Sequence, residues 1–343
     1  MTALLDRARS GDQDAFAELV EPHRRELHVH CYRMLGSFDD ADDAVQETLL
    51  AAWRGLAAFQ ARASVRTWLY RVATNTCLNQ VRTASRRLQM TEPLPAAAPA
   101  PTGSENVTWL QPYPDALLDA LPDQAPGPEA RVEQDEAVSL AFVTALQLLS
   151  PRARAVLILR DVLGFSAREV AATLGSTEEA VAMTLSRARA SLRARPAGPG
   201  PGGPARPGSA AEAALVRRLA AAFAAHDVDT VVSLLAQDVR ITMPPLPAVW
   251  EGRRSAAGFL AEVAFRLVPE ARFVQTRANR QPALAVYTRD EANGLWHGSG
   301  LLVITPRGGQ VAGLTRFESH TMRAFGLPRV LPGDEDTAAG TSA

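Results

Sequence analysis

Two proline-rich stretches divide this chain, and they constrain its fold more than any other feature. Residues 88–134 contain nine prolines and cannot form one long helix, because proline lacks the amide donor and clashes with the preceding turn. Residues 196–208, PAGPGPGGPARPG, are five Pro and five Gly out of thirteen, which is typical of a linker. We therefore expect ordered blocks at 1–87, 135–195 and 209–328, and a disordered tail at 329–343.

Composition bounds the class of protein. The 343 residues are 47% hydrophobic, enough for two or three domains with cores of their own. All 36 basic residues are arginine and they balance 37 acidic residues, which excludes a uniformly basic nucleic-acid coat. Only Cys31 and Cys77 are present, so we do not expect a disulfide-framed secreted protein. A polar N-terminus and the lack of an apolar run of ~18 residues predict no signal peptide, no membrane association and a cytoplasmic location.

Charge is segregated along the chain. Residues 1–60 carry eleven acids and six arginines, whereas residues 61–90 carry six arginines and no acid. Residues 150–195 carry eight arginines and four acids. An acidic segment followed by two basic segments is what a bridge between a basic protein partner and a nucleic acid needs.

The second block carries the sharpest local motif. Ser166-Ala-Arg-Glu169 has the spacing of a capping box that begins a helix up to Leu174, and Gly175 follows as a left-handed C-cap. Ser176-Thr-Glu-Glu179 is a second such box, which begins a basic helix to about residue 195. This pattern predicts a helix-turn-helix, whose second helix enters the DNA major groove. Taken alone, the segment also fits an ordinary helical hairpin with a solvated arginine face.

The first block is helical by pattern, and its polar residues form two groups. Acidic residues are concentrated at the start of its second helix: Asp39, Asp40, Asp42, Asp43 and Glu47. They can bind a basic protein surface, or they can simply face solvent near the positive end of the helix dipole. A third helix, from about residue 65 to residue 86, carries amides and guanidiniums that can contact phosphates and base edges: Arg66, Arg71, Asn75, Asn79 and Arg82. Trp68 lies among apolar neighbours and is expected in the core.

The third block changes character. Helical patterns at 212–225 and 230–235 are followed by short alternating strands, which indicates an α+β domain.

Three segments closely resemble bacterial extracytoplasmic-function sigma factors of RNA polymerase. They are HCYRMLGSFDDADDAVQETLLAAWR (30–54), RASVRTWLYRVATNTCLNQVR (62–82) and LSPRARAVLILRDVLGFSAREVAATLGSTEEAVAMTLSRARASL (149–192). LLAQDVRITMPPLP (234–247) and FGLP (325–328) are similar to SnoaL-like domains of the nuclear-transport-factor-two superfold. The resemblance implies a multidomain fold: two all-α sigma domains, the second a helix-turn-helix, followed by a cone-shaped α+β SnoaL-like domain.

The resemblance also implies roles for individual residues. Region 2 (1–87) would bind the β′ clamp of core RNA polymerase through Asp39, Asp40, Asp42, Asp43, Gln46 and Glu47. It would recognise and melt the minus-ten element through Phe59, Arg62, Ser64, Arg66, Arg71, Asn75, Asn79, Arg82 and Arg86, with loop 59–64 capturing an unstacked base. Residues 88–134 would be a linker that passes through a polymerase channel.

Region 4 (135–195) would bind the β flap and read the minus-thirty-five element through Arg168, Ser176, Thr177, Glu178, Ala182, Ser186, Arg187 and Arg189. Ala182, Met183 and Thr184 stand where relatives often have basic or polar groups. This departure weakens the expected direct readout of bases and leaves Arg187 and Arg189 mainly for phosphates. Arg189 equally fits a structural role at the helix end.

Two further clusters invite a site. His23, His28, His30 and Cys31 suggest zinc, but only His28 and Cys31 share a helix face, so we predict no metal and no cofactor. In the third block, a pocket would be lined by Met243, Trp250, Phe259, Trp296, His297 and Phe317. These side chains can equally pack the interior of the cone-shaped domain and leave no pocket. Because no carboxylate–histidine pair is recognisable there, we predict regulation of sigma activity and no enzyme.

We therefore expect a promoter-specificity subunit that binds core RNA polymerase and promoter DNA. An anti-sigma factor and a small ligand stay open as further partners. Two rival functions also stay open: a ligand-responsive helix-turn-helix repressor that does not bind polymerase, and a SnoaL-type enzyme tethered to a DNA-binding module.

Overall fold

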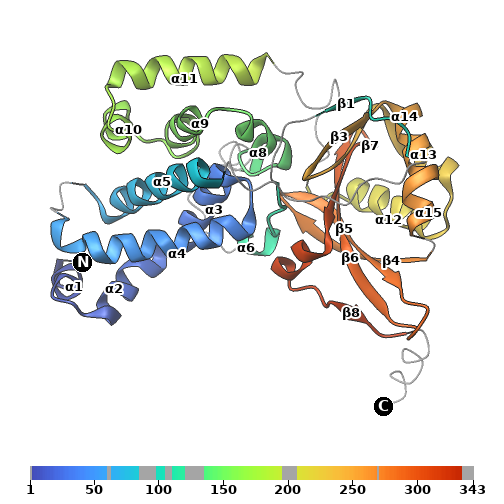
Figure 1. The fold of residues 1–343 in the computed structure, drawn as a ribbon, viewed down its shortest axis with the longest axis horizontal. Coiled ribbons are helices and arrows are strands. Elements are labelled where there is room, and N and C mark those ends of the chain that lie inside the picture. The colour runs from blue at the N-terminus through green and yellow to red at the C-terminus, as the bar shows by residue number, and fades with distance from the viewer. Residues whose placement is uncertain are drawn as a thin grey trace. The chain divides into compact units, whose positions relative to one another are not determined.

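The computed structural model describes residues 2–59, 63–84, 98–104, 110–119, 135–194, 207–268 and 270–333. The chain divides into two compact units, which are described separately (Figure 1). The helical unit comprises Met1–Leu88 and Leu117–Pro196, and the sheet unit comprises Gln89–Ala116 and Ala197–Ala343. The first part of the proline-rich segment therefore belongs to the same unit as the C-terminal block, although the sequence indicated a separate linker.

The N-terminal half of the helical unit is a set of short helices around one long pair. Its elements are α1 (Thr2–Arg9), α2 (Gln13–Val20), η1 (Glu21–His23), α3 (Arg24–Leu35), α4 (Phe38–Gly55), η2 (Leu56–Ala58) and α5 (Val65–Ala84). Ser37 caps α4, because its side chain accepts a hydrogen bond from the amide of Asp40 at 3.1 Å. Gly36 ends α3 at φ 77°, a conformation that favours glycine.

The second half contains the expected helix-turn-helix. Its elements are α8 (Leu140–Gln147), α9 (Pro151–Leu157), the π-helical turn η3 (Ile158–Val162), α10 (Ala167–Leu174) and α11 (Glu178–Arg193). The capping box of Ser166 and Glu169 is present, and Gly175 has φ 57°. The second predicted capping box is wrong: Thr177 rather than Ser176 is the N-cap of α11, and its hydroxyl accepts from the amide of Ala180 at 3.2 Å. The helix therefore starts one residue later than predicted.

Buried polar contacts join the two halves of the helical unit. Arg33 donates from Nε to the carbonyl of Ala137 at 2.9 Å, and Gln147 donates to the carbonyl of Arg33 at 3.3 Å. Arg154, 5% exposed, donates to the carbonyls of Leu146, at 2.9 Å, and of Met34. Burial lowers the pKa of Arg154 to about 10. Because these guanidiniums satisfy carbonyls at helix ends, the packing of α3 against α8 and α9 depends on them.

The sheet unit is an α+β domain, as expected. Its eight-stranded sheet has the order β1-β3-β2-β7-β6-β5-β4, with β8 paired to β6. The pair β2–β7 is parallel and the other pairs are antiparallel. The strands are β1 (Gly103–Ser104), β2 (Leu235–Met243), β3 (Leu246–Glu251), β4 (Ala271–Ala278), β5 (Gln281–Arg289), β6 (Trp296–Arg307), β7 (Gln310–Glu318) and β8 (Val330–Leu331).

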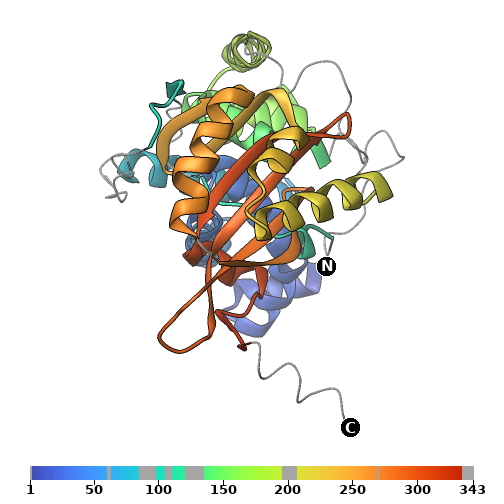
Figure 2. The same ribbon diagram turned by 90° about the vertical axis from the view of Figure 1, so that its right-hand side faces the viewer.

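Helices cover one face of this sheet (Figure 2). They are α12 (Ala210–Ala224), α13 (Val228–Leu234), α14 (Arg253–Phe259), the π-helical turn η4 (Leu260–Ala264) and α15 (Phe265–Leu267). An apolar core lies between helices and sheet and includes Leu219, Trp250, Phe259, Leu302 and Leu314. The turn η5 (Ser319–Phe325) follows β7.

Candidate nucleic-acid interface

The acidic residues of α4 form one solvent-facing strip. The helix buries Ala41, Ala44, Val45, Thr48 and Ala52, which turns the opposite side outward. Asp39, Asp42, Asp43, Gln46 and Glu47 are exposed, and Asp40 is half-buried. Leu50, which the sequence analysis did not single out, is 56% exposed on the same helix. Carboxylates beside one exposed apolar side chain suit a basic protein surface.

A polar face of α5 carries four of the nine residues expected to meet the minus-ten element. Arg71, Asn75, Asn79 and Arg82 are exposed and lie four, four and three residues apart, on one side of the helix. Arg66 is engaged elsewhere: its Nε donates to Glu26 at 2.9 Å, and its guanidinium lies 4.9 Å from the centre of the Tyr70 ring. Arg62 and Arg86 lie outside the described residues.

Phe59 is not freely presented. It is 8% exposed and stacks on Trp68 with ring centres 4.8 Å apart, within a small core of α1, α2 and η2 residues. Ser64 instead begins α5, where its hydroxyl accepts from the amide of Thr67 at 3.0 Å. A groove of about 390 Å³ lies beside this stack. Its walls include Thr67 and Arg71 of α5 and also Glu169, Ala172 and Thr173 of α10.

The outer side of α11 is the expected DNA-reading surface. Val181, Leu185 and Ala188 are buried, so the remaining positions face outward. Of the predicted contacts, Arg168, Thr177, Glu178, Ala182, Ser186, Arg187 and Arg189 are exposed and Ser176 is half-buried. Arg189 is held by Asp161 through two bonds, 2.9 Å from Nε and 2.6 Å from a terminal nitrogen. Asp161 raises the pKa of Arg189, and this pairing favours the structural role for that arginine.

Two histidines near the start of the chain, His28 and His30, pack against aromatic rings. His30 is fully buried, lies 3.0 Å from the Thr74 hydroxyl and packs edge-on against Tyr70. Burial lowers the pKa of His30 to about 3 and that of His28 to about 4. Among the described residues, no group of three or more potential metal ligands comes together.

The six residues expected around a C-terminal pocket do not converge. Trp250 and Phe259 belong to the apolar core, with ring centres 4.2 Å apart, and Met243 packs against it. Phe317 pairs with Leu301 in the sheet and is not part of that core cluster. Trp296 and His297 lie at the end of β6, where they pair with Leu331 and Val330 of β8.

Comparison with known proteins matches each of these parts to a family. Family models match residues 19–87 as sigma-70 region 2, residues 139–192 as sigma-70 region 4 and residues 216–321 as a SnoaL-like domain. The ECF RNA polymerase sigma factor SigG of Mycobacterium tuberculosis is 40% identical over 291 residues, which cover 82% of this chain and 75% of SigG. The chain belongs to the extracytoplasmic-function (ECF) RNA polymerase sigma factors.

One solved ECF sigma factor shares its fold. The crystal structure of SigJ from Mycobacterium tuberculosis matches with a TM-score of 0.58 and 26% identity, over 89% of this chain and 97% of SigJ. The sigma factor RpoE in complex with the anti-sigma factor NepR, from Bartonella quintana, is 26% identical over 53% of this chain and 94% of that chain, with a TM-score of 0.33.

Membership in this family excludes one of the two rival functions left open above. ECF sigma factors bind core RNA polymerase and promoter DNA and perform no covalent chemistry themselves, so the repressor is set aside. Within the part of the chain that the structure describes, no helix is both long and apolar enough to cross a membrane.

The segment between regions 2 and 4 of this ECF sigma factor is built into the SnoaL-like domain at two places, which the sequence analysis missed. At the first, Thr102 donates its amide to the carbonyl of Val249 at 2.9 Å, and its hydroxyl accepts from the amide of Glu251 at 2.7 Å. Trp250 donates from Nε1 to the carbonyl of Pro99 at 3.0 Å, and Ala98 packs on the domain core. These bonds add β1 to the edge of the sheet.

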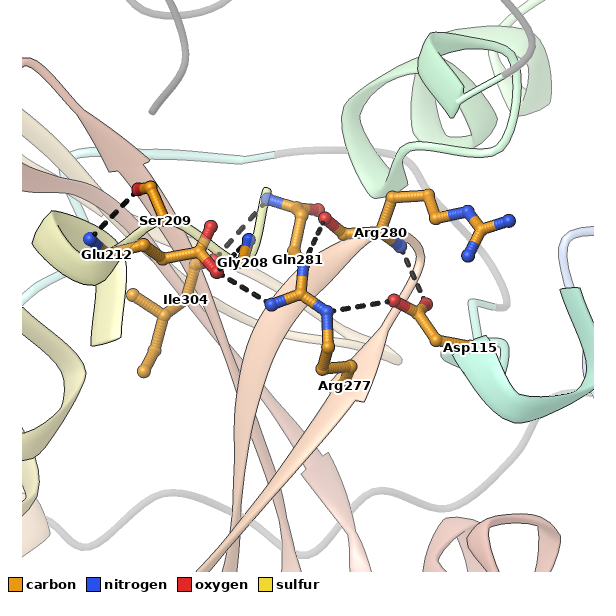
Figure 3. A network of polar contacts seen from close by, with 8 residues as sticks. All are labelled: Asp115, Gly208, Ser209, Glu212, Arg277, Arg280, Gln281 and Ile304. Atoms are coloured by element: carbon orange, nitrogen blue, oxygen red, sulfur yellow. Dashed lines mark hydrogen bonds and ion pairs between the residues drawn. The ribbon is translucent and has the colours of Figure 1, made fainter. Parts of the chain in front are cut away.

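The second place is the turn between β4 and β5. Tyr113 and Asn279 exchange two hydrogen bonds, at 2.8 and 2.9 Å. Asp115 accepts from the amide of Arg280 at 2.8 Å and from Nε of Arg277 at 3.2 Å, and Arg277 also donates to Glu212 at 2.6 Å (Figure 3). Burial raises the pKa of Asp115 despite these donors.

One sequence signal could have revealed this docking. Leu110 and Tyr113 are large apolar residues within a proline-rich stretch, and they are 5% and 2% exposed. Large apolar side chains are unusual in a solvated linker, because they stabilise a structure only when another surface buries them.

Proposed function

We propose that this ECF sigma factor initiates transcription through three helix faces and that its SnoaL-like domain restrains it by holding the linker. In this account region 2 (1–87) binds the β′ clamp through the acidic strip of α4 and contacts the minus-ten strand through the polar face of α5. Region 4 (135–195) binds the β flap and places α11 in the major groove of the minus-thirty-five element. The SnoaL-like domain (209–328) acts on residues 98–115.

The docked linker is the observation that carries the regulatory part of this proposal. Thr102, Tyr113 and Asp115 each make hydrogen bonds to the SnoaL-like domain. Arg277 joins Asp115 to Glu212, and both carboxylates are buried, with side chains 7% and 4% exposed. Release of the linker would take Asp115 away from Arg277 and leave Glu212 as the remaining partner of that arginine, so this ion pair holds the linker through a single carboxylate.

Docking and polymerase binding compete for the same segment. The family resemblance implies that the linker passes through a channel of the polymerase. Residues 98–104 and 110–115 cannot lie in that channel while they are hydrogen-bonded to β3 and to the β4–β5 turn. The SnoaL-like domain therefore opposes assembly with core polymerase until the linker is released. An anti-sigma factor or a small ligand that shifts this equilibrium stays a prediction.

Weakening the docked linker tests the proposal. A double variant, Thr102→Ala with Asp115→Ala, removes the side-chain hydrogen bonds by which these two linker residues hold the SnoaL-like domain. Both substitutions lie in the linker, so the SnoaL-like domain itself is unchanged. We expect it to bind core polymerase at least about fivefold more tightly than the wild type, the factor that corresponds to one hydrogen bond of ~1 kcal/mol. Ser104→Ala is the control, because Ser104 lies two residues after Thr102, in β1, and its side chain is exposed.

The measurement is core affinity by fluorescence anisotropy, together with run-off transcription. Unchanged or weaker binding by the double variant would contradict the restraint. Absence of binding by every form, wild type included, would contradict the polymerase-binding surfaces assigned to regions 2 and 4.

A further inference from the structure

Met183 is the most exposed large apolar side chain of region 4. It lies on α11 and is 54% exposed, a value that only Leu50 exceeds among the large apolar residues described. At 100° per residue, it points almost directly away from the buried side formed by Val181, Leu185 and Ala188. Glu179 precedes it by one turn and Arg187 follows it by one turn, and both are exposed.

The charged residues near Met183 on α11 differ from it in the groups that they can contact on DNA. Arg189 is bound to Asp161 by two hydrogen bonds and lies on another side of α11. Arg187 has no such partner among the described residues and suits a phosphate or a guanine. Glu179 can accept from the amino group of a cytosine. Between Glu179 and Arg187, therefore, the exposed side of α11 presents a thioether and not a hydrogen-bonding group.

Only one group in the major groove matches an apolar side chain. Thymine exposes its C5-methyl there, whereas the other bases present hydrogen-bond donors and acceptors at their groove edges. An apolar contact with this methyl discriminates a T·A pair from the others without any hydrogen bond.

We infer that Met183 reads a thymine of the minus-thirty-five element through its C5-methyl group and thereby determines promoter specificity. This inference rests on the proposed placement of α11 in the major groove. It assigns base reading to a residue at which the sequence pattern indicated only weak readout.

The test starts with a pool of promoter duplexes in which the minus-thirty-five region is randomised. Holoenzyme assembled from core polymerase and the full chain selects from this pool, and the bound DNA is sequenced. Wild type and Met183→Leu should both enrich a thymine at one position, whereas Met183→Ala should lose that enrichment. Because Met183 is exposed, Met183→Ala is expected to fold normally, and its binding to core polymerase confirms this.

A second measurement isolates the methyl group. Deoxyuridine replaces the selected thymine, which removes the C5-methyl and nothing else. Wild-type affinity should fall about three- to fourfold, the factor expected for one buried methyl group, and the affinity of Met183→Ala should not change.

The outcomes separate the inference from the proposed function. If the wild type selects a minus-thirty-five sequence and Met183→Ala selects the same one, the inference is overturned while the role of α11 stands. If the wild type shows no base preference in this region, the placement of α11 in the groove fails, and the inference fails with it.

Discussion

At the scale of single residues, charge pairing decides which arginines can reach DNA. Arg189 is exposed on α11, the helix proposed to read DNA, yet Asp161 binds its guanidinium through two hydrogen bonds. Arg66, on α5, is likewise held by Glu26. Arg71 and Arg187 are exposed on the same helices, and neither takes part in an ion pair among the described residues. Sequence position alone does not distinguish these cases, because all four arginines lie on helix surfaces.

Asp161→Asn should release Arg189 toward DNA. Without the carboxylate, the guanidinium is free to neutralise one more phosphate, so promoter affinity should rise at low salt. The slope of log K against log salt should steepen by about 0.9. Fluorescence anisotropy across a salt series measures both. The control is Arg189→Ala in the wild-type background, which should change the slope little; a large loss of slope there would show that Arg189 already contacts DNA.

His30 should make the helical unit sensitive to acid. The ordinary pKa of histidine is 6.5, and burial lowers that of His30 to about 3, so only the unfolded chain takes up this proton in between. The free energy of unfolding is therefore unaffected by protonation of His30 above pH 6.5. It decreases as the pH falls toward 3, by up to about 1.4 kcal/mol per pH unit.

His30→Gln should therefore flatten the pH dependence of the free energy of unfolding between pH 6.5 and 4.5, measured by urea denaturation. His320→Gln is the control, because His320 is exposed and lies in the sheet unit. Parallel pH profiles for the wild type and His30→Gln would rule out this role of burial.

At the scale of helices and strands, periodicity predicted most of the structure correctly. The capping box at Ser166, the glycine turn at Gly175 and the amphipathic pattern of α5 each depend on local contacts, so the residues themselves determine them. The N-cap of α11, Thr177, was missed by one residue, because Ser176 and Thr177 are both good N-caps and only the packed turn selects between them.

Reversing charge on α4 should weaken polymerase binding. Asp42→Arg with Asp43→Arg places two cations on an exposed strip that is expected to face a basic surface, so core affinity should fall at least tenfold. Asp14→Arg with Glu18→Arg makes the same charge change on α2, where both residues are exposed, and should leave affinity nearly unchanged. Equal losses in the two variants would mean that net charge, and not this strip, governs binding.

Neutralising α5 should impair promoter opening. Arg71→Ala with Arg82→Ala removes two exposed cations from the polar face, so open-complex formation should slow and its salt dependence should weaken by about two phosphate contacts. Permanganate footprinting follows the opening. Arg217→Ala with Arg218→Ala, exposed on α12, removes the same charge and serves as the control. Identical opening at every salt concentration would remove Arg71 and Arg82 from the DNA path.

At the scale of the whole molecule, the relation between the linker and the SnoaL-like domain escaped prediction. Proline content predicts that no long helix spans residues 88–134, but it does not report where such a segment lies. The bond between Thr102 and Val249 joins residues 147 positions apart, and that between Tyr113 and Asn279 joins residues 166 positions apart. Contacts over such separations leave no periodic trace in a single sequence.

Hydrogen exchange of residues 98–115, in the free protein and in the holoenzyme with core RNA polymerase, tests the central claim most directly. In the free protein the amides of Thr102 and Tyr113 are bonded to Val249 and Asn279, so both should exchange slowly. In a transcribing holoenzyme the linker should have left the SnoaL-like domain, and Asn279, whose amide donates to Tyr113, should lose its protection. Protection of Asn279 that is equally strong in both states would contradict the account.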